Sequence, residues 1–218
     1  MTVLQEDLNK LPKLIVGFMI MSFGIVLNKT SLLGLSSWNL FHDGLAVQTG
    51  ISFGVLIQIV GLIILLFSVL AFKTKIGFGT LLNVLLVGFF IDKLTKFFVF
   101  VPNTILEQSL LLGAGILLMT FGRAFYISAK LGAGPRDGLF VGLSRITQVD
   151  VKYIKPSIEL IVLVAGFIMG GTAGVGTIIT IVVSGYLVQY FFRLLGFDPK
   201  KERQRSLMDY KQQKDAII

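Results

Sequence analysis

An internal repeat constrains this chain more than any other feature of its sequence. The segment LGAGPRDGLFVGLSRIT at 131–147 aligns with LGLSSWNLFHDGLAVQT at 33–49, and Asn39 falls on Asp137. The match continues outwards in two short motifs, MSFG at 21–24 with MTFG at 119–122, and GFGT at 77–80 with GVGT at 174–177. The chain is therefore predicted to be two copies of one unit, each with a polar, glycine-containing segment between its apolar runs.

Composition places both copies in a membrane. Apolar residues make up 54% of the chain, charged residues only 15%, and the mean hydropathy is +0.84. A soluble domain this apolar would aggregate, so a polytopic integral membrane protein is expected. Cysteine is absent and His42 is the only histidine, which excludes disulfides, thiolate sites and histidine-cluster metal sites. We expect no cofactor.

Six apolar spans are predicted, and the fold class is therefore all-α. They cover about 11–28, 51–72, 80–98, 105–129, 153–170 and 177–195. We interpret residues 1–218 as a single membrane domain, with repeat one at 11–98, repeat two at 109–195 and a basic cytoplasmic tail at 198–218. The net charge of +8 is concentrated at span ends and in this tail, so it indicates topology and no nucleic-acid binding.

Charge also decides between three and four spans per copy. If the polar segments do not cross the bilayer, each copy has three spans and the second copy must be inverted. If they cross, each copy has four and the copies are parallel. The six-span arrangement keeps Lys73 and Lys75 inside, whereas the eight-span arrangement moves them outside. The sequence thus predicts two inverted three-span repeats, with the N-terminus and the C-terminus cytoplasmic.

The polar segments 33–49 and 131–147 have two interpretations. Irregular backbone survives at membrane depth only when it is buried in protein or lines a wet cavity, as in the broken helices of transporters. Each segment is then a short re-entrant helix whose start attracts an anion. In the other interpretation, both segments lie flat at the interface as amphipathic connectors. The pattern does not separate these alternatives.

The candidate substrate site consists of four residues from the two segments. Asn39 and Asp137 keep polarity at equivalent positions, where an aspartate at the bilayer centre costs on the order of 3 kcal/mol. Arg136 and His42 would set the charge of a shared cavity and favour an anionic or zwitterionic small molecule. Arg123 and Glu159 lie at similar depth in consecutive spans, and a structural ion pair between them is expected.

The motifs themselves resemble a known family. LGAGPRDGLFVGLSRIT, the IEL span and GVGT, together with GISFG at 50–54 and IGFGT at 76–80, are similar to the YczE/YyaS/YitT group of bacterial integral membrane proteins. The resemblance implies a multi-pass protein of the bacterial cytoplasmic membrane and no settled activity. Such proteins usually carry Gly-Pro-Trp-Asp in the first copy, where this chain has Ser36-Ser37-Trp38-Asn39.

The function that these observations favour is a small-molecule transporter or channel-like permease with a site between the repeats. No Gly-x-x-x-x-Gly-Lys-Ser/Thr motif is present, so transport would be secondary or energised by a separate ATPase partner. The alternative is a non-transporting component, either a substrate-capture subunit or an accessory factor of a larger system. An enzyme is not expected, because no nucleophile–base pair or paired carboxylates occur. Beyond the lipid bilayer and the ligand, a second copy of the chain is a further partner to consider.

The topology is testable with a reporter fused after Lys75. The six-span arrangement places this loop in the cytoplasm, so a cytoplasmic reporter should be active there and a periplasmic one silent. A reporter signal that places the loop after Lys75 outside the cytoplasm would contradict the inverted arrangement.

Overall fold

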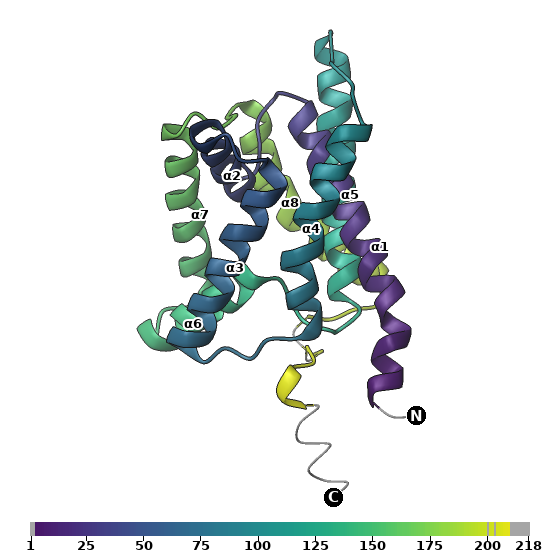
Figure 1. Ribbon diagram of the computed structural model, residues 1–218, viewed down its shortest axis with the longest axis vertical. Coiled ribbons are helices and arrows are strands. Elements are labelled where there is room, and N and C mark those ends of the chain that lie inside the picture. The colour runs from purple at the N-terminus through teal and green to yellow at the C-terminus, as the bar shows by residue number, and fades with distance from the viewer. Residues whose placement is uncertain (1–2, 200, 203, 210–218) are drawn as a thin grey trace, which may run out of the picture.

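The computed structural model describes residues 3–199, 201–202 and 204–209, and every regular element among them is a helix. Eight helices follow one another along this part of the chain (Figure 1): α1 (Val3–Thr30), α2 (Ser37–Thr49), α3 (Phe53–Phe72), α4 (Phe78–Phe97), α5 (Ile105–Ile127), α6 (Pro135–Thr147), α7 (Val151–Ile168) and α8 (Val175–Leu194). The prediction of an all-α fold is confirmed.

Five of the described helices are long and apolar enough to cross a membrane, namely Gln5–Thr30 within α1, and α3, α4, α5 and α8. The predicted span at 153–170 corresponds to α7, which has 18 residues and carries Lys152, Lys155 and Glu159. The short helices α2 and α6 have 13 residues each, about 20 Å of helix, which is less than a bilayer core of about 30 Å. A multi-pass membrane protein is thus supported, and the number of spans stays a prediction.

Local sequence explains where the helices begin. Thr104 and Glu107 form a reciprocal capping box at the start of α5, and Ser52 caps α3 by accepting a hydrogen bond from the Val55 amide. Pro135 is the first residue of α6, where its missing N–H removes no helical hydrogen bond.

Helices α1 and α5 share the most extensive contact among the described helices, and their close approaches are reciprocal. A Cβ added at Gly17 would lie 2.7 Å from the Cβ of Tyr126, and one added at the equivalent Gly115 would lie 2.7 Å from the amide N of Asn28. Likewise Gly24 lies against the backbone of Met119, and its equivalent Gly122 lies against that of Met21. The contacts run in opposite directions along the two helices, so α1 and α5 are antiparallel. Glycines at these crossings allow the backbones to touch.

Each polar segment is held by the opposite copy. The Gly176 amide at the start of α8 donates to the Leu33 carbonyl at 2.7 Å, and the Gly79 amide at the start of α4 donates to the Leu131 carbonyl, also at 2.7 Å. Gly34 (φ +119°) and Gly132 (φ +127°) follow these carbonyls in a conformation that only glycine adopts without strain. Consequently α2 packs on α7 and α6 packs on α3, as Figure 1 shows at the two ends of the molecule.

The described part of the tail returns to the end where α1 begins. The Arg205 guanidinium lies 2.6 Å from Asp7 and 3.3 Å from Glu6 of α1. The Arg205 and Leu207 amides donate to the carbonyls of Lys130 and Ile76. The tail therefore joins the N-terminus, the α3–α4 connection and the α5–α6 connection. Residues 200, 203 and 210–218 of the predicted basic tail lie outside the described residues.

The α1–α5 contact predicts that Gly24→Leu destabilises the protein. A Cβ at Gly24 would lie 2.7 Å from the Gly115 carbonyl oxygen, so the helices must separate, and we expect a loss of about 1–3 kcal/mol. Thermal unfolding, followed by the fluorescence of the single tryptophan, measures it. Gly113→Leu on the outer side of α5 is the matched control, because no atom lies within 4 Å of a Cβ there. Equal melting temperatures for the two variants would contradict the proposed packing.

Candidate functional site

The two short helices begin at the same place in the interior. Residues 36–39 at the start of α2 and 134–137 at the start of α6 line one cavity of about 430 Å³. The Arg136 guanidinium carbon lies 4.5 Å from the centroid of the Trp38 ring, so the two first turns are in direct contact. The positive ends of both helix dipoles thus face the same volume from opposite ends of the molecule.

The remaining walls of the cavity come from the long helices. Apolar side chains of α1, α3 and α4 form one side, including Met21, Ile57 and Val87. On the other side, α5 contributes Arg123 and Tyr126. The cavity also reaches α7 and α8, whose contributions include Lys155, Glu159, Ser184 and Gln189. Mixed walls of this kind, apolar with a few converging polar groups, are typical of small-molecule sites.

Two arginines in the cavity are not neutralised by direct ion pairs. Among the described residues, no carboxylate oxygen lies within 4.0 Å of the guanidinium nitrogens of Arg123 or Arg136. Asp137, Tyr126 and Glu159 line the same cavity as Arg123. A cation held inside a membrane protein without a close counter-ion is costly, so its presence indicates a function.

The structure brings most of the predicted site residues together. Asn39, Arg136 and Asp137 all line the central cavity, as do Arg123 and Glu159. The last two make no ion pair at 4.0 Å in the described residues, so the predicted direct contact is absent from this structure. Each faces the cavity from its own helix, and Asp137 is the other carboxylate in the cavity lining.

His42 lies apart from the other predicted residues. It is fully buried in α2, enclosed by the rings of Trp38, Phe41 and Phe53 at centroid distances of 6.4, 5.9 and 6.4 Å, and it does not line the cavity. Burial, together with the charge of Arg136, holds the pKa of His42 well below its usual value. His42 is therefore a neutral packing residue at physiological pH.

Sequence reasoning missed Trp38 and Tyr126 as parts of the site. Trp38 is 8% exposed and carries Arg136 on its ring. Its indole N–H has no hydrogen-bond partner among the described residues. Tyr126 follows Arg123 by three residues, a spacing that puts both on one helix face, and this signal was present in the sequence. The described residues hold no cluster of three metal-ligating side chains.

Asp43 fastens α2 to two other elements. Its carboxylate accepts from Lys29 Nζ at 2.6 Å, from the Thr172 amide at 2.9 Å and from the Thr172 hydroxyl at 2.7 Å. Burial alone raises the pKa of Asp43, but the hydrogen bonds and charge of Lys29 and Thr172 outweigh it, and the pKa is lowered overall. The ionised form therefore joins the end of α1, the short helix α2 and the α7–α8 connection.

We expect Asp43→Asn to reduce stability at pH 7 by about 1–3 kcal/mol, through loss of charge-assisted hydrogen bonds. Because the folded pKa is lowered, this stabilisation is complete above the ordinary aspartate pKa of about 4 and is lost as the pH falls through the folded pKa. Melting temperatures at pH 7 and pH 3 measure the difference. Asp150→Asn, at an exposed pair with Lys152, is the control and should change little. If the melting temperatures of Asp43→Asn and the wild type differ as much at pH 3 as at pH 7, the stabilising role of the Asp43 charge is contradicted.

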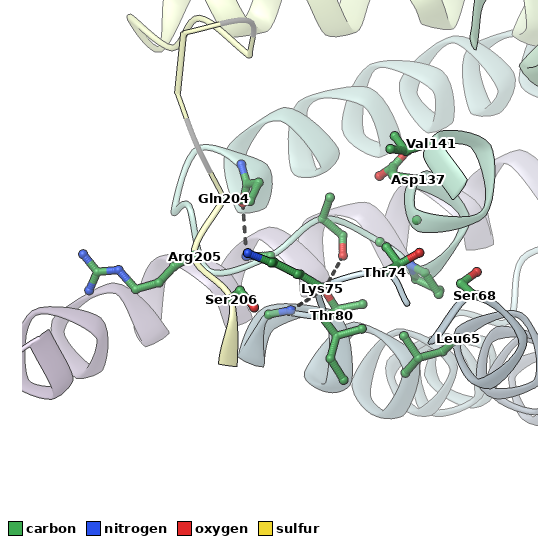
Figure 2. Close-up of a pocket in the computed structure, with 17 residues that line it drawn as sticks. Leu65, Ser68, Thr74, Lys75, Thr80, Asp137, Val141, Gln204, Arg205 and Ser206 are labelled. Atoms are coloured by element: carbon green, nitrogen blue, oxygen red, sulfur yellow. Dashed lines mark hydrogen bonds between the residues drawn. The ribbon is translucent and has the colours of Figure 1, made fainter. Parts of the chain in front are cut away.

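A second cavity of about 320 Å³ lies beside the first. In Figure 2, Gln204, Arg205 and Ser206 of the tail lie on one side of it and Asp137 and Val141 of α6 on the other. The Gly132 amide donates to Gln204 Oε1 at 3.1 Å, and the Thr80 hydroxyl donates to the Ala133 carbonyl at 2.6 Å. Asp137 lines both cavities, so the first turn of α6 is the partition between them.

Comparisons with known proteins agree with the resemblance seen in the motifs. The sequence pattern of DUF6198, described as a family of unknown function, matches residues 8–193. The chain is 34% identical over 178 residues to the uncharacterized membrane protein YczE of Bacillus subtilis, covering 80% of this chain and 81% of that protein. It is 32% identical to an uncharacterized protein of Haemophilus influenzae, covering 84% and 83%. It is also 26% identical to the uncharacterized protein YyaS of Bacillus subtilis, covering 83% and 90%.

These matches confirm the YczE and YyaS part of the predicted relationship and a membrane protein of uncharacterised function. The link to YitT stays a prediction. No solved structure matches the chain.

Proposed function

The chain belongs to DUF6198, a family of unknown function, and we propose that this member is a small-molecule transporter or channel-like permease of the bacterial cytoplasmic membrane. Its site is the central cavity between the two copies. Its ligand is an anionic or zwitterionic small molecule. The observation that carries the proposal is a pair of arginines, Arg123 and Arg136, that line this cavity with no carboxylate of the described residues in ion-pair contact.

The proposal includes an inverted arrangement of the repeats. Equivalent residues of α1 and α5 make reciprocal contacts along antiparallel helices. Such contacts are related by a two-fold axis perpendicular to both helices, and this axis lies in the membrane plane when the helices span. Inverted repeats with a site at their interface are common in secondary transporters. We propose six spans, with both termini cytoplasmic.

The same geometry favours re-entrant helices over interfacial connectors. The first turns of α2 and α6 contact each other inside the molecule, whereas two flat connectors on opposite membrane surfaces would be separated by the bilayer core. Trp38 is buried rather than at the headgroup level. In this arrangement the free backbone N–H groups of both helix starts, and the two guanidinium groups, are available to one anion.

Ligand stabilisation tests the proposal directly. A panel of small carboxylates, phosphates and amines is screened against the purified protein by thermal shift, because a ligand that binds only the folded state raises the melting temperature. We expect an anion to stabilise the wild type and Arg123→Gln to weaken its binding by roughly 10-fold or more, since charge-assisted hydrogen bonds contribute about 1.5–3 kcal/mol. Lys96→Gln, an exposed cation outside the cavity, is the control.

Transport is then measured by counterflow of the stabilising anion in proteoliposomes. Uptake that depends on Arg123 supports a transporter. Binding without counterflow supports the alternative, a substrate-capture subunit that works with an ATPase partner. No stabilisation by any anion, or equal stabilisation of Arg123→Gln and the wild type, would refute an anion site.

Asp137→Asn makes a separate prediction. The substitution removes one of the two carboxylates that line the cavity and preserves shape, so the cavity becomes more positive. We expect anion affinity to rise several-fold, by about 1 kcal/mol, with little change in melting temperature without ligand. The affinity is measured by titrating the anion into the protein and following the fluorescence of Trp38, the single tryptophan. Unchanged affinity would mean that Asp137 has no part in the site.

A further inference from the structure

The two copies differ at one helix pair. In the first copy α3 packs closely on α4 through Gly54 and Gly88: a Cβ at Gly54 would lie 2.6 Å from Asp92 Cγ, and one at Gly88 would lie 2.6 Å from Gln58 Cγ. The equivalent helices of the second copy are α7 and α8, and Gly185 is equivalent to Gly88. No atom lies within 4 Å of a Cβ added at Gly185, and α7 and α8 have no comparable packing among the described residues.

The central cavity extends into this separation. Its lining includes Lys155 and Glu159 from α7, and Ser184, Gly185 and Gln189 from α8. Outer side chains of both helices are apolar and exposed, for example Ile161 at 66% and Val182 at 55%. A bilayer would cover such a surface. The cavity therefore has a lateral mouth on the face that lipid would contact.

A lateral mouth restricts which molecules pass through it. A small, strongly hydrated ion loses its hydration in hydrocarbon at high cost, so it does not arrive by this route. An amphipathic molecule already partitions into the bilayer, with its charged head near the interface and its chain in the core. The lining of the cavity includes three apolar side chains of α8, namely Ile181, Val188 and Phe192.

We propose that the ligand is an amphipathic organic anion that reaches the cavity from the bilayer through a portal between α7 and α8. Its carboxylate or phosphate head binds Arg123 and Arg136, and its apolar chain lies along α8 past Gly185. This proposal rests on the anion site proposed above and adds the class of ligand and the route. The charged side chains of the cavity are three cations (Arg123, Arg136, Lys155) and two carboxylates (Asp137, Glu159). They leave a net positive charge that favours an anionic head.

The test uses the full chain in phosphatidylcholine nanodiscs, with the emission of Trp38, its only tryptophan, as the signal. The probes are monooctyl phosphate and monomethyl phosphate, which share a head and differ in the chain. Gly185→Leu fills the portal where the structure has open space, so the fold should tolerate it. Gly113→Leu, equally open but outside the cavity, is the matched control.

We expect Gly185→Leu to weaken the binding of monooctyl phosphate by 10-fold or more. The affinity for monomethyl phosphate should stay within 2-fold of the wild-type value. Gly113→Leu should change neither. Arg123→Gln should weaken the binding of both probes by 10-fold or more, because both bind through the same phosphate head.

The failures are distinguishable. If monomethyl phosphate binding depends on Arg123 but Gly185→Leu does not affect monooctyl phosphate, the portal is refuted and the anion site stands. If neither probe gives a signal that depends on Arg123, the anion site is refuted as well. If Gly185→Leu changes the oligomeric state, measured by light scattering, the separation is an interface between two copies and the portal is refuted.

Discussion

The structure depends on satisfying backbone polar groups where the chain leaves its helices inside the membrane protein. A backbone polar group that is buried away from water needs a hydrogen-bond partner from the protein itself. Here each polar segment uses the other copy: the Leu33 carbonyl accepts from the Gly176 amide, and the Leu131 carbonyl accepts from the Gly79 amide. Because these bonds are exchanged between copies, neither copy is complete alone. The short helices that follow are therefore fixed in direction and begin at a common place.

Close approach of backbones provides the second constraint. The α1–α5 pair places glycine opposite backbone at four equivalent positions, and no larger residue fits there without separating the helices. At one end of the molecule Asp43 accepts hydrogen bonds from Lys29 and Thr172. At the other end Arg205 forms an ion pair with Asp7 of α1. The cavity lies among the α1–α5 pair, the two short helices and α3, α4, α7 and α8. Its charged residues lie on α5, α6 and α7.

Much of this could be predicted from the sequence, and the reasons are physical. The alignment of 33–49 with 131–147 predicts two copies, and hydropathy predicts the long helices, because both properties are encoded residue by residue. Asn39, Arg136 and Asp137 were identified because polar residues stand out in apolar surroundings. Trp38 and Tyr126 were missed because aromatic residues fit an interface, a core or a ligand site equally well. His42 was misplaced for a similar reason: its burial depends on Phe53, a residue of another helix.

The sequence by itself determined an all-helical membrane chain with a repeated pattern of apolar runs and polar segments. It also determined a small set of polar residues that are costly to bury in hydrocarbon. Tertiary structure decided which of those residues meet. Arg123, Asp137 and Glu159 line one cavity, and Arg136 lies on Trp38, a residue almost one hundred positions away. Tertiary structure also decided that α7 stands away from α8 while α3 packs on α4, although Gly185 and Gly88 are equivalent. A repeated sequence encodes equivalent helices, but helix packing is a property of pairs, and only the folded chain brings the pairs together.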